Sequence, residues 1–251
     1  CVLIASKISL QLACWFFSQP HFYDNYALLF ASSRNGQTDI VKYTIDTGIK
    51  EFINYSPEGG EYSPQRIPGT DDISAVRLDN TGLQRFYRYD INTGNSKEII
   101  RNLEVAYPLW ASNKLLFSAV IGEKSLELVK SDLKNKTNVL LEKNIGRSLH
   151  CIPGTNSISF ISKKKPLWEI FSIDITTLTI NKITNLDDNY EDIAWISKDV
   201  VLQAKKNQLL QFNIKTDSVW KELINKDSLQ IQNISRITIS PDKTKIAIVG
   251  E

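Results

Sequence analysis

Hydrophobic and polar residues alternate in short runs along this 251-residue chain, and no stretch keeps a helical period. Residues 157–160 read Ser-Ile-Ser-Phe, and residues 86–89 read Phe-Tyr-Arg-Tyr before a polar turn. A period of two places successive side chains on opposite faces of an extended backbone, so these runs predict half-buried strands. The pattern predicts an all-β protein.

The runs belong to a repeat. Each unit begins with an apolar anchor, followed by a short turn and a β-rich run. The anchors are Phe22, Ile67, Trp110, Ile152, Trp195 and Ile239, at steps of 45, 43, 42, 43 and 44 residues. Pairs such as Pro68-Gly69 and Pro241-Asp242 follow the anchors, and their restricted or left-handed backbone suits a tight hairpin.

A second recurring segment, which we call the second phrase, is an apolar or aromatic run closed by a polar turn. It recurs at nearly the same spacing as the anchors. It begins at Tyr43, Tyr89, Ser131, Ile173 and Phe212, at steps of 46, 42, 42 and 39 residues. A period of about 40 to 45 residues with four strands per unit is typical of a β-propeller blade. The sequence therefore predicts a six-bladed β-propeller with four-stranded antiparallel blades, formed by residues 1–251 as a single domain.

The last blade needs strands from the other end of the chain, because six first phrases are matched by only five second ones. Stepping back from Phe22 by the usual spacing predicts a third strand at residues 2–4 and a fourth at residues 8–13. Both termini would then share one blade, which leaves the ring no free seam. We expect the N-terminus to be truncated or irregular. A lipid anchor at Cys14 is disfavoured because Gln11 stands where such sites have an aliphatic residue.

Composition narrows the choice of partner. Thirty basic and 28 acidic residues give a formal charge of +2 and are interspersed, which argues against nucleic acid because phosphate binding needs a concentrated basic face. No apolar run is long enough for a transmembrane helix. Three cysteines, far apart, do not reveal the redox compartment. We expect a monomer.

Motifs for catalysis are missing from the sequence. There is no Gly-x-Ser-x-Gly elbow, no phosphate-binding glycine loop and no paired cysteine motif, and His21 and His150 are the only histidines. We therefore predict no catalytic residues, no cofactor and no metal. Residues 187–192 offer the best carboxylate cluster for calcium, but an acidic loop between blades is the favoured interpretation. Residues 163–165, three lysines, are interpreted as a solvated turn, and the tryptophans as packing between sheets.

Several phrases resemble the TolB-type six-bladed propeller, the Pro-Asp variety of WD-repeat-like propellers, over roughly residues 18–251. They are Ser240-Pro241-Asp242 with the following Lys-Ile-Ala-Ile, the run from Ser32 to Ile40 leading to Tyr43 and Gly48, and residues 57–64 and 145–150, which resemble a bacterial subgroup with an isolated propeller. The resemblance implies a periplasmic or envelope location and a protein-binding scaffold without chemistry of its own.

The candidate site follows from the blade geometry, since the residues just before each anchor begin the innermost strands and would face one central funnel. As ligand- or partner-binding residues we predict Gln19, His21, Glu61, Tyr62, Tyr107, Arg147, His150, Glu191, Asp192 and Arg236. Their mixed charge suits a peptide terminus, a carboxylate or another small polar group. The same residue types also form salt bridges between blades, and this second interpretation stays open.

Two other functions also stay open. The chain could be the substrate-gating propeller of a prolyl-oligopeptidase-like serine peptidase, in which case a Gly-x-Ser-x-Gly motif would follow residue 251. A propeller enzyme acting on a sugar or lactone would require a bound metal.

Overall fold

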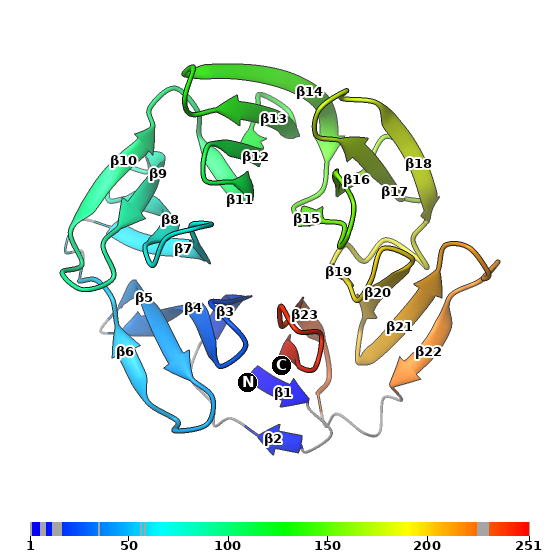
Figure 1. The fold of residues 1–251 in the computed structure, drawn as a ribbon, viewed down its shortest axis with the longest axis horizontal. Coiled ribbons are helices and arrows are strands. Elements are labelled where there is room, and N and C mark those ends of the chain that lie inside the picture. The colour runs from blue at the N-terminus through cyan, green and yellow to red at the C-terminus, as the bar shows by residue number, and fades with distance from the viewer. Residues whose placement is uncertain are drawn as a thin grey trace. The chain divides into compact units, whose positions relative to one another are not determined.

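A computed structural model describes residues 2–5, 9–11, 17–34, 36–55, 57, 59–224 and 231–250. Every regular element in these ranges is a strand, which confirms the all-β prediction (Figure 1). Within the described residues, no helix is long and apolar enough to cross a membrane. The chain divides into two compact units, residues 1–106 with 238–249 and residues 107–237 with 250–251, which are described separately. The single-domain prediction stays a prediction.

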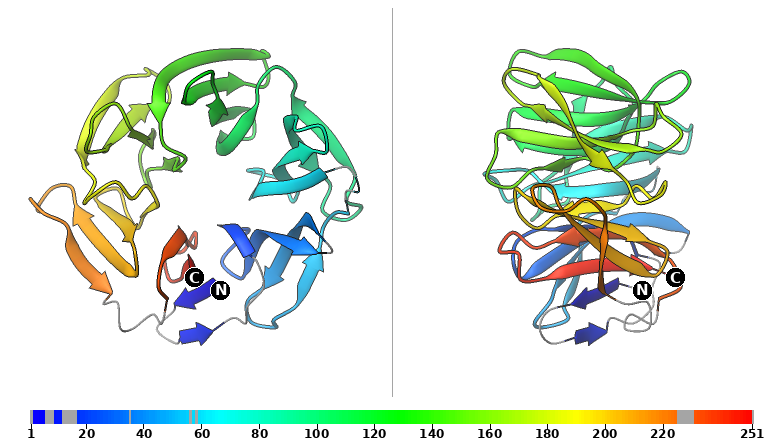
Figure 2. Two further views of the ribbon diagram at one scale, coloured as in Figure 1. Left: turned by 180° about the vertical axis from the view of Figure 1, so that it is seen from behind. Right: turned by 90° about the vertical axis from the view of Figure 1, so that its right-hand side faces the viewer.

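Among the described residues, the first unit contains ten complete strands from the N-terminal part of the chain, most of the last strand, and the ends of two strands that continue in the second unit. The ten complete strands and the last strand are β1 (Val2–Ala5), β2 (Ser9–Gln11), β3 (Phe17–Phe22), β4 (Ala27–Arg34), β5 (Gln37–Thr44), β6 (Lys50–Phe52), β7 (Gly59–Arg66), β8 (Ile73–Asp79), β9 (Gln84–Tyr89), β10 (Ser96–Ile100) and β24 (Ile246–Gly250). Strands β3 to β6 and β7 to β10 each form a four-stranded antiparallel sheet in chain order. Both views in Figure 2 show these sheets in blue to cyan.

The second unit contains the middle strands. They are β11 (Val105–Ser112), β12 (Leu115–Ile121), β13 (Leu126–Asp132), β14 (Thr137–Ile145), β15 (His150–Cys151), β16 (Ser157–Ser162), β17 (Glu169–Asp174), β18 (Ile180–Asn185), β19 (Ile193–Trp195), β20 (Val200–Lys205), β21 (Gln208–Asn213), β22 (Lys221–Ile224) and the start of β23 (Ile234–Ile239). Strands β19 to β22 form one sheet, and β11 to β18 form another in which Ile145 and Ser162 link two four-stranded runs.

Strands from both ends of the chain share one antiparallel sheet. Strand β1 lies between β2 and β24, with Val2 opposite Val249 and Ala5 opposite Ile246. The strands predicted at residues 2–4 and 8–13 therefore correspond to β1 and β2. Residues 8, 12 and 13 of the second prediction lie outside the described residues.

Burial on both faces explains why the central strands are continuously apolar. In β4, Leu28 and Phe30 pack with Ala247 of β24, whereas Leu29 points to the other face and packs with Ile73 and Ala75 of β8. A strand covered on both faces has no polar side to alternate with. Outer strands such as β6 and β22 are largely exposed instead.

Acidic residues organise the turns of the second phrase. The carboxylates of Asp90, Asp132 and Asp174 each accept hydrogen bonds from the backbone N–H groups two and three residues later, at 2.7 to 3.0 Å. Such bonds stabilise a turn locally. Gly48 and Gly94 have φ angles of 69° and 70°, the left-handed conformation for which the Thr-Gly pairs were expected.

Candidate functional site

The ten predicted site residues are divided between the two units. The first unit holds Gln19 and His21 on β3 and Glu61 and Tyr62 on β7. The second unit holds Tyr107, Arg147, His150, Glu191, Asp192 and Arg236. We describe each group within its own unit.

Glu61 belongs to a buried polar network and has no exposed surface. Its Oε1 accepts hydrogen bonds from Arg77 Nε at 2.8 Å and from the Tyr89 hydroxyl at 2.9 Å, and its Oε2 accepts one from Asn54 Nδ2 at 2.8 Å. A carboxylate satisfied by three internal donors is held in the fold and cannot face a ligand. Glu61 is therefore not part of the site developed below.

Gln19 lies at an irregular point of β3, and β7 has a matching irregularity. The pairing of β3 with β4 slips by one residue between Ser18 and His21, and that of β7 with β8 slips between Tyr62 and Gln65. Gln19 and Ser63 have φ angles of 53° and 50°, and the Ser63 N–H donates to Gln19 Oε1 at 2.6 Å. Sequence reasoning missed both bulges, although each contains a Gln-Pro or Ser-Pro pair.

His21 and Tyr62 are also held against their own unit. Burial lowers the pKa of His21 to about 4, so the imidazole is neutral at pH 7. The Tyr62 ring packs over Gly60, where an added Cβ would lie 3.2 Å from the phenol oxygen. Neither side chain makes a contact here that identifies a ligand.

In the second unit five of the six predicted residues come together. Tyr107 lies on β11, Arg147 in the loop before β15, His150 on β15, Glu191 and Asp192 just before β19, and Arg236 on β23. The contacts join residues 44 and 45 positions apart, Arg147 to Glu191 and Arg147 to Asp192. These separations are close to the repeat period, so the loops before two successive anchors come side by side.

Arg147 is the hub of this arrangement, which we call the arginine cluster and define as Arg147, Lys163, Glu191, Asp192 and Arg236. Its Nη2 donates to Asp192 Oδ2 at 2.7 Å, and its backbone N–H donates to Glu191 Oε2 at 2.8 Å. Its Nε lies 3.7 Å from Glu191 Oε1 and, although buried, makes no hydrogen bond to the described residues. The guanidinium therefore keeps an unsatisfied donor.

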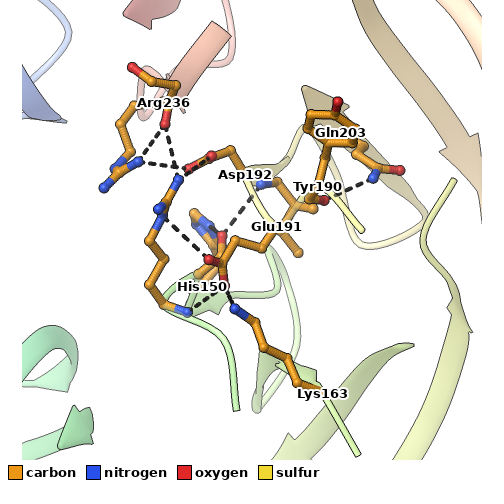
Figure 3. Close-up of polar contacts among 11 residues, drawn as sticks. His150, Lys163, Tyr190, Glu191, Asp192, Gln203 and Arg236 are labelled. Atoms are coloured by element: carbon orange, nitrogen blue, oxygen red, sulfur yellow. Dashed lines mark hydrogen bonds and ion pairs between the residues drawn. The ribbon is translucent and has the colours of Figure 1, made fainter. Parts of the chain in front are cut away.

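Arg236 and Lys163 add two cations to the cluster. Arg236 Nη1 donates to the Ser235 carbonyl at 2.5 Å and lies 3.5 Å from Asp192 Oδ1, beyond the usual length of a charge-assisted hydrogen bond. Lys163 Nζ lies 3.0 Å from Glu191 Oε2 and 3.9 Å from the centre of the Trp168 ring. Figure 3 shows Lys163 and Arg236 approaching the two carboxylates from different elements.

The pKa shifts reflect partial burial and shared charges. Burial raises the pKa of Asp192, although Arg147 and Arg236 oppose the shift. Burial lowers the pKa of Arg236 and the positive charge of Arg147 adds to this effect, while Asp192 opposes it. Burial also disfavours the charge of Arg147, but Asp192 and Glu191 outweigh it and raise that pKa.

His150 adjoins the cluster through Ser148. The Ser148 hydroxyl lies 2.9 Å from His150 Nε2 and accepts a hydrogen bond from the Ile193 N–H, the residue after Asp192, at 3.4 Å. Five of the six residues predicted in this unit therefore lie close together, namely Arg147, His150, Glu191, Asp192 and Arg236. Whether they bind a ligand stays a prediction.

Two features of the cluster were not predicted. Lys163 was assigned to a solvated turn, but it pairs with Glu191, and Lys164 and Lys165 pair with Glu142 and Glu169. Gly146 leaves space for the Glu191 carboxylate, with which an added Cβ would collide. Lysines after a strand end are commonly solvated, so the sequence carries no signal for these pairs.

The acidic residues nearby are paired with cations. Asp187 lies 2.9 Å from Lys205 Nζ, and Glu191 and Asp192 face Lys163 and Arg147. Among the described residues, no group of three or more histidine, cysteine, aspartate or glutamate side chains is placed to hold a metal ion. The arginine cluster offers donors for an anion.

Comparison with solved structures identifies the fold as a β-propeller. A protein assigned as TolB from Agrobacterium tumefaciens is 14% identical, with a TM-score of 0.77 and coverage of 99% of this chain and 96% of that one. TolB from Acinetobacter baumannii is also 14% identical, with a TM-score of 0.60 and coverage of 94% and 55%. No family model and no curated protein matches the chain.

A propeller from a protease is also similar. The β-propeller domain of the Trilobed protease from Pyrococcus furiosus is 13% identical, with a TM-score of 0.56 and coverage of 96% of this chain and 80% of that one. Likeness at this level of identity concerns the fold alone.

Proposed function

We propose that this chain is a TolB-like, non-catalytic propeller that serves as a protein-interaction scaffold in the bacterial periplasm or cell envelope. The observation that carries the proposal is the likeness to the Agrobacterium tumefaciens protein assigned as TolB, which extends over nearly the full length of both chains. The Ser240-Pro241-Asp242 phrase resembles the same family. Location and role come from that resemblance.

In this proposal the propeller has six blades, and the last blade takes strands from both termini. The four-stranded runs and the pairing of β1 with β24 support this arrangement. The chain acts as a monomer. Its partner is a protein or peptide that contacts the arginine cluster, where cationic and anionic side chains remain partly exposed, Arg147 and Arg236 by 29% and 24%.

Capture from an envelope fraction tests the proposal. We expect the immobilised chain to retain a specific protein, and the double variant Arg147→Gln/Arg236→Gln to retain much less, because two donors are removed at the contact. Arg101→Gln is the matched control, since this arginine is 84% exposed and lies in the other unit. Retention of the same protein by the folded double variant and by the parent would contradict the proposed site, and an empty capture would contradict the scaffold role.

A peptidase propeller is the second candidate, favoured by the likeness to the Trilobed protease domain. In that case the propeller would gate access to a hydrolase domain. A longer reading frame with Gly-x-Ser-x-Gly after residue 251 would favour this function, whereas a stop codon near residue 251 would favour the scaffold.

A further inference from the structure

The arginine cluster contains more positive than negative charge. Arg147, Lys163 and Arg236 contribute three cations, while Glu191 and Asp192 contribute two carboxylates. The two carboxylates are shared, because Glu191 contacts both Lys163 and Arg147, and Asp192 contacts both arginines. These five residues therefore carry one net positive charge, in a region that water reaches only partly.

Arg236 is the cation with the weakest internal partner. Its distance of 3.5 Å from Asp192 Oδ1 contrasts with the 2.7 Å that separates Arg147 Nη2 from Asp192 Oδ2. Its only hydrogen bond to the described residues is from Nη1 to the Ser235 carbonyl, so Nε and Nη2 have no acceptor there. Arg147 Nε also makes no hydrogen bond to the described residues, but it is buried beside Glu191, so an incoming ligand does not reach it directly.

We propose that Arg236, assisted by the positive charge of Arg147, binds one carboxylate group of a peptide partner. A guanidinium presents two parallel N–H donors that match the two oxygens of a carboxylate, and one bound carboxylate would neutralise the excess charge. The inference rests on the proposed function, because it names the chemical group through which a partner would bind at the same cluster. The carboxylate is either a chain terminus or an acidic side chain.

Short peptides distinguish these two sources. The probes are acetyl-Ala-Ala-Ala with a free C-terminus, its C-terminal amide, and acetyl-Ala-Asp-Ala amide, titrated at low salt while NMR follows the arginine Nε–Hε signals. We expect the free acid to shift the signals of Arg236 and Arg147 with a dissociation constant on the order of 1 mM. The amide should leave them unchanged. The aspartyl peptide shows whether a side-chain carboxylate suffices.

Two substitutions of Arg236 separate the effect of its paired N–H donors from the effect of its charge. Arg236→Gln should weaken binding of the free acid by about tenfold or more, and Arg236→Lys, which keeps the charge but loses the fork, should also weaken it. Glu191→Gln should strengthen binding by roughly two- to fivefold, because it removes a competing negative charge. If the cluster only stabilised the fold, Glu191→Gln would not be expected to strengthen binding while Arg236→Gln weakens it. Arg101→Gln should bind like the parent chain.

Several outcomes would overturn the inference. Equal shifts with the free acid and the amide, unchanged binding in a folded Arg236→Gln variant, parental binding by Arg236→Lys, or weaker binding in Glu191→Gln would each do so. If the envelope capture succeeds and loses its partner in the double variant while no peptide carboxylate binds, the proposed function stands and this inference fails. If the free acid binds but the capture is empty, the carboxylate site stands and the proposed scaffold function fails.

Discussion

At the scale of single residues, the same side-chain types serve two different purposes. Glu61 is fully buried and accepts three hydrogen bonds, so its charge is neutralised within the fold. Asp192 is also mostly buried, but two arginines share it and one of them lies at 3.5 Å. A carboxylate with a complete set of donors stabilises the structure, whereas in our proposal the carboxylate shared by two arginines leaves positive charge available to a ligand.

His21 gives the residue-scale prediction. Its pKa of about 4 in the folded chain lies below its ordinary value of 6.5, so the unfolded chain takes up a proton first as the pH falls. The contribution of His21 to stability is present above about pH 6.5 and is lost between about 6.5 and 4, by up to about 3 kcal/mol. His21→Gln should show a shallower loss of unfolding free energy over this window in urea titrations. Parallel curves for variant and parent would contradict the assignment.

At the scale of elements, the period of the repeat carries most of what could be predicted. Anchors about 43 residues apart located the strands, and the same spacing placed Arg147 beside Glu191 and Asp192. The burial of Glu61 was not predictable, because it depends on Arg77 and Tyr89 of neighbouring strands. The role of Lys163 was missed because it also depends on a residue distant in the sequence, its partner Glu191 being 28 residues away.

The bulges at Gln19 and Ser63 were not predicted, although a proline follows each of them and proline within a sheet is confined to edge strands and bulges. Each strand carries one more residue than its neighbour opposes, and the residue before the proline takes a positive φ. Such a conformation costs a non-glycine residue roughly 1 kcal/mol or more. This strain therefore occurs at similar positions before two successive anchors, Phe22 and Ile67.

Ser63 tests this strain. Ser63→Gly should leave the unfolding free energy unchanged or raise it by up to about 1 kcal/mol, because glycine adopts a φ of 50° without a steric penalty and the Ser63 hydroxyl has only a 3.5 Å contact with the Ala106 carbonyl. Ser63→Val should lower it by about 1 to 3 kcal/mol, since a branched Cβ is poorly tolerated there. Chemical denaturation of the two variants compares them directly. A glycine variant less stable than the valine variant would refute the strain.

At the scale of the whole molecule, one sheet pairs strands from the two ends of the chain, so its stability depends on contacts between residues far apart in the sequence. Strand β1 has paired neighbours on both sides, β2 and β24. Contacts between residues nearly the full chain length apart form only after a large loss of chain entropy. We therefore expect this sheet to respond strongly to damage in the backbone of β1.

Leu3→Pro tests that expectation, since Leu3 lies opposite Ile248 of β24 and Gln11 of β2. Proline removes a backbone N–H from the middle of a sheet and should lower the unfolding free energy by about 3 kcal/mol. Leu3→Ala keeps the N–H and should have the smaller effect. Thermal unfolding followed by circular dichroism measures both variants against the parent. If the proline variant melts at the parental temperature, pairing of β1 with β24 does not contribute to the stability of the chain, and the proposed last blade loses its main support.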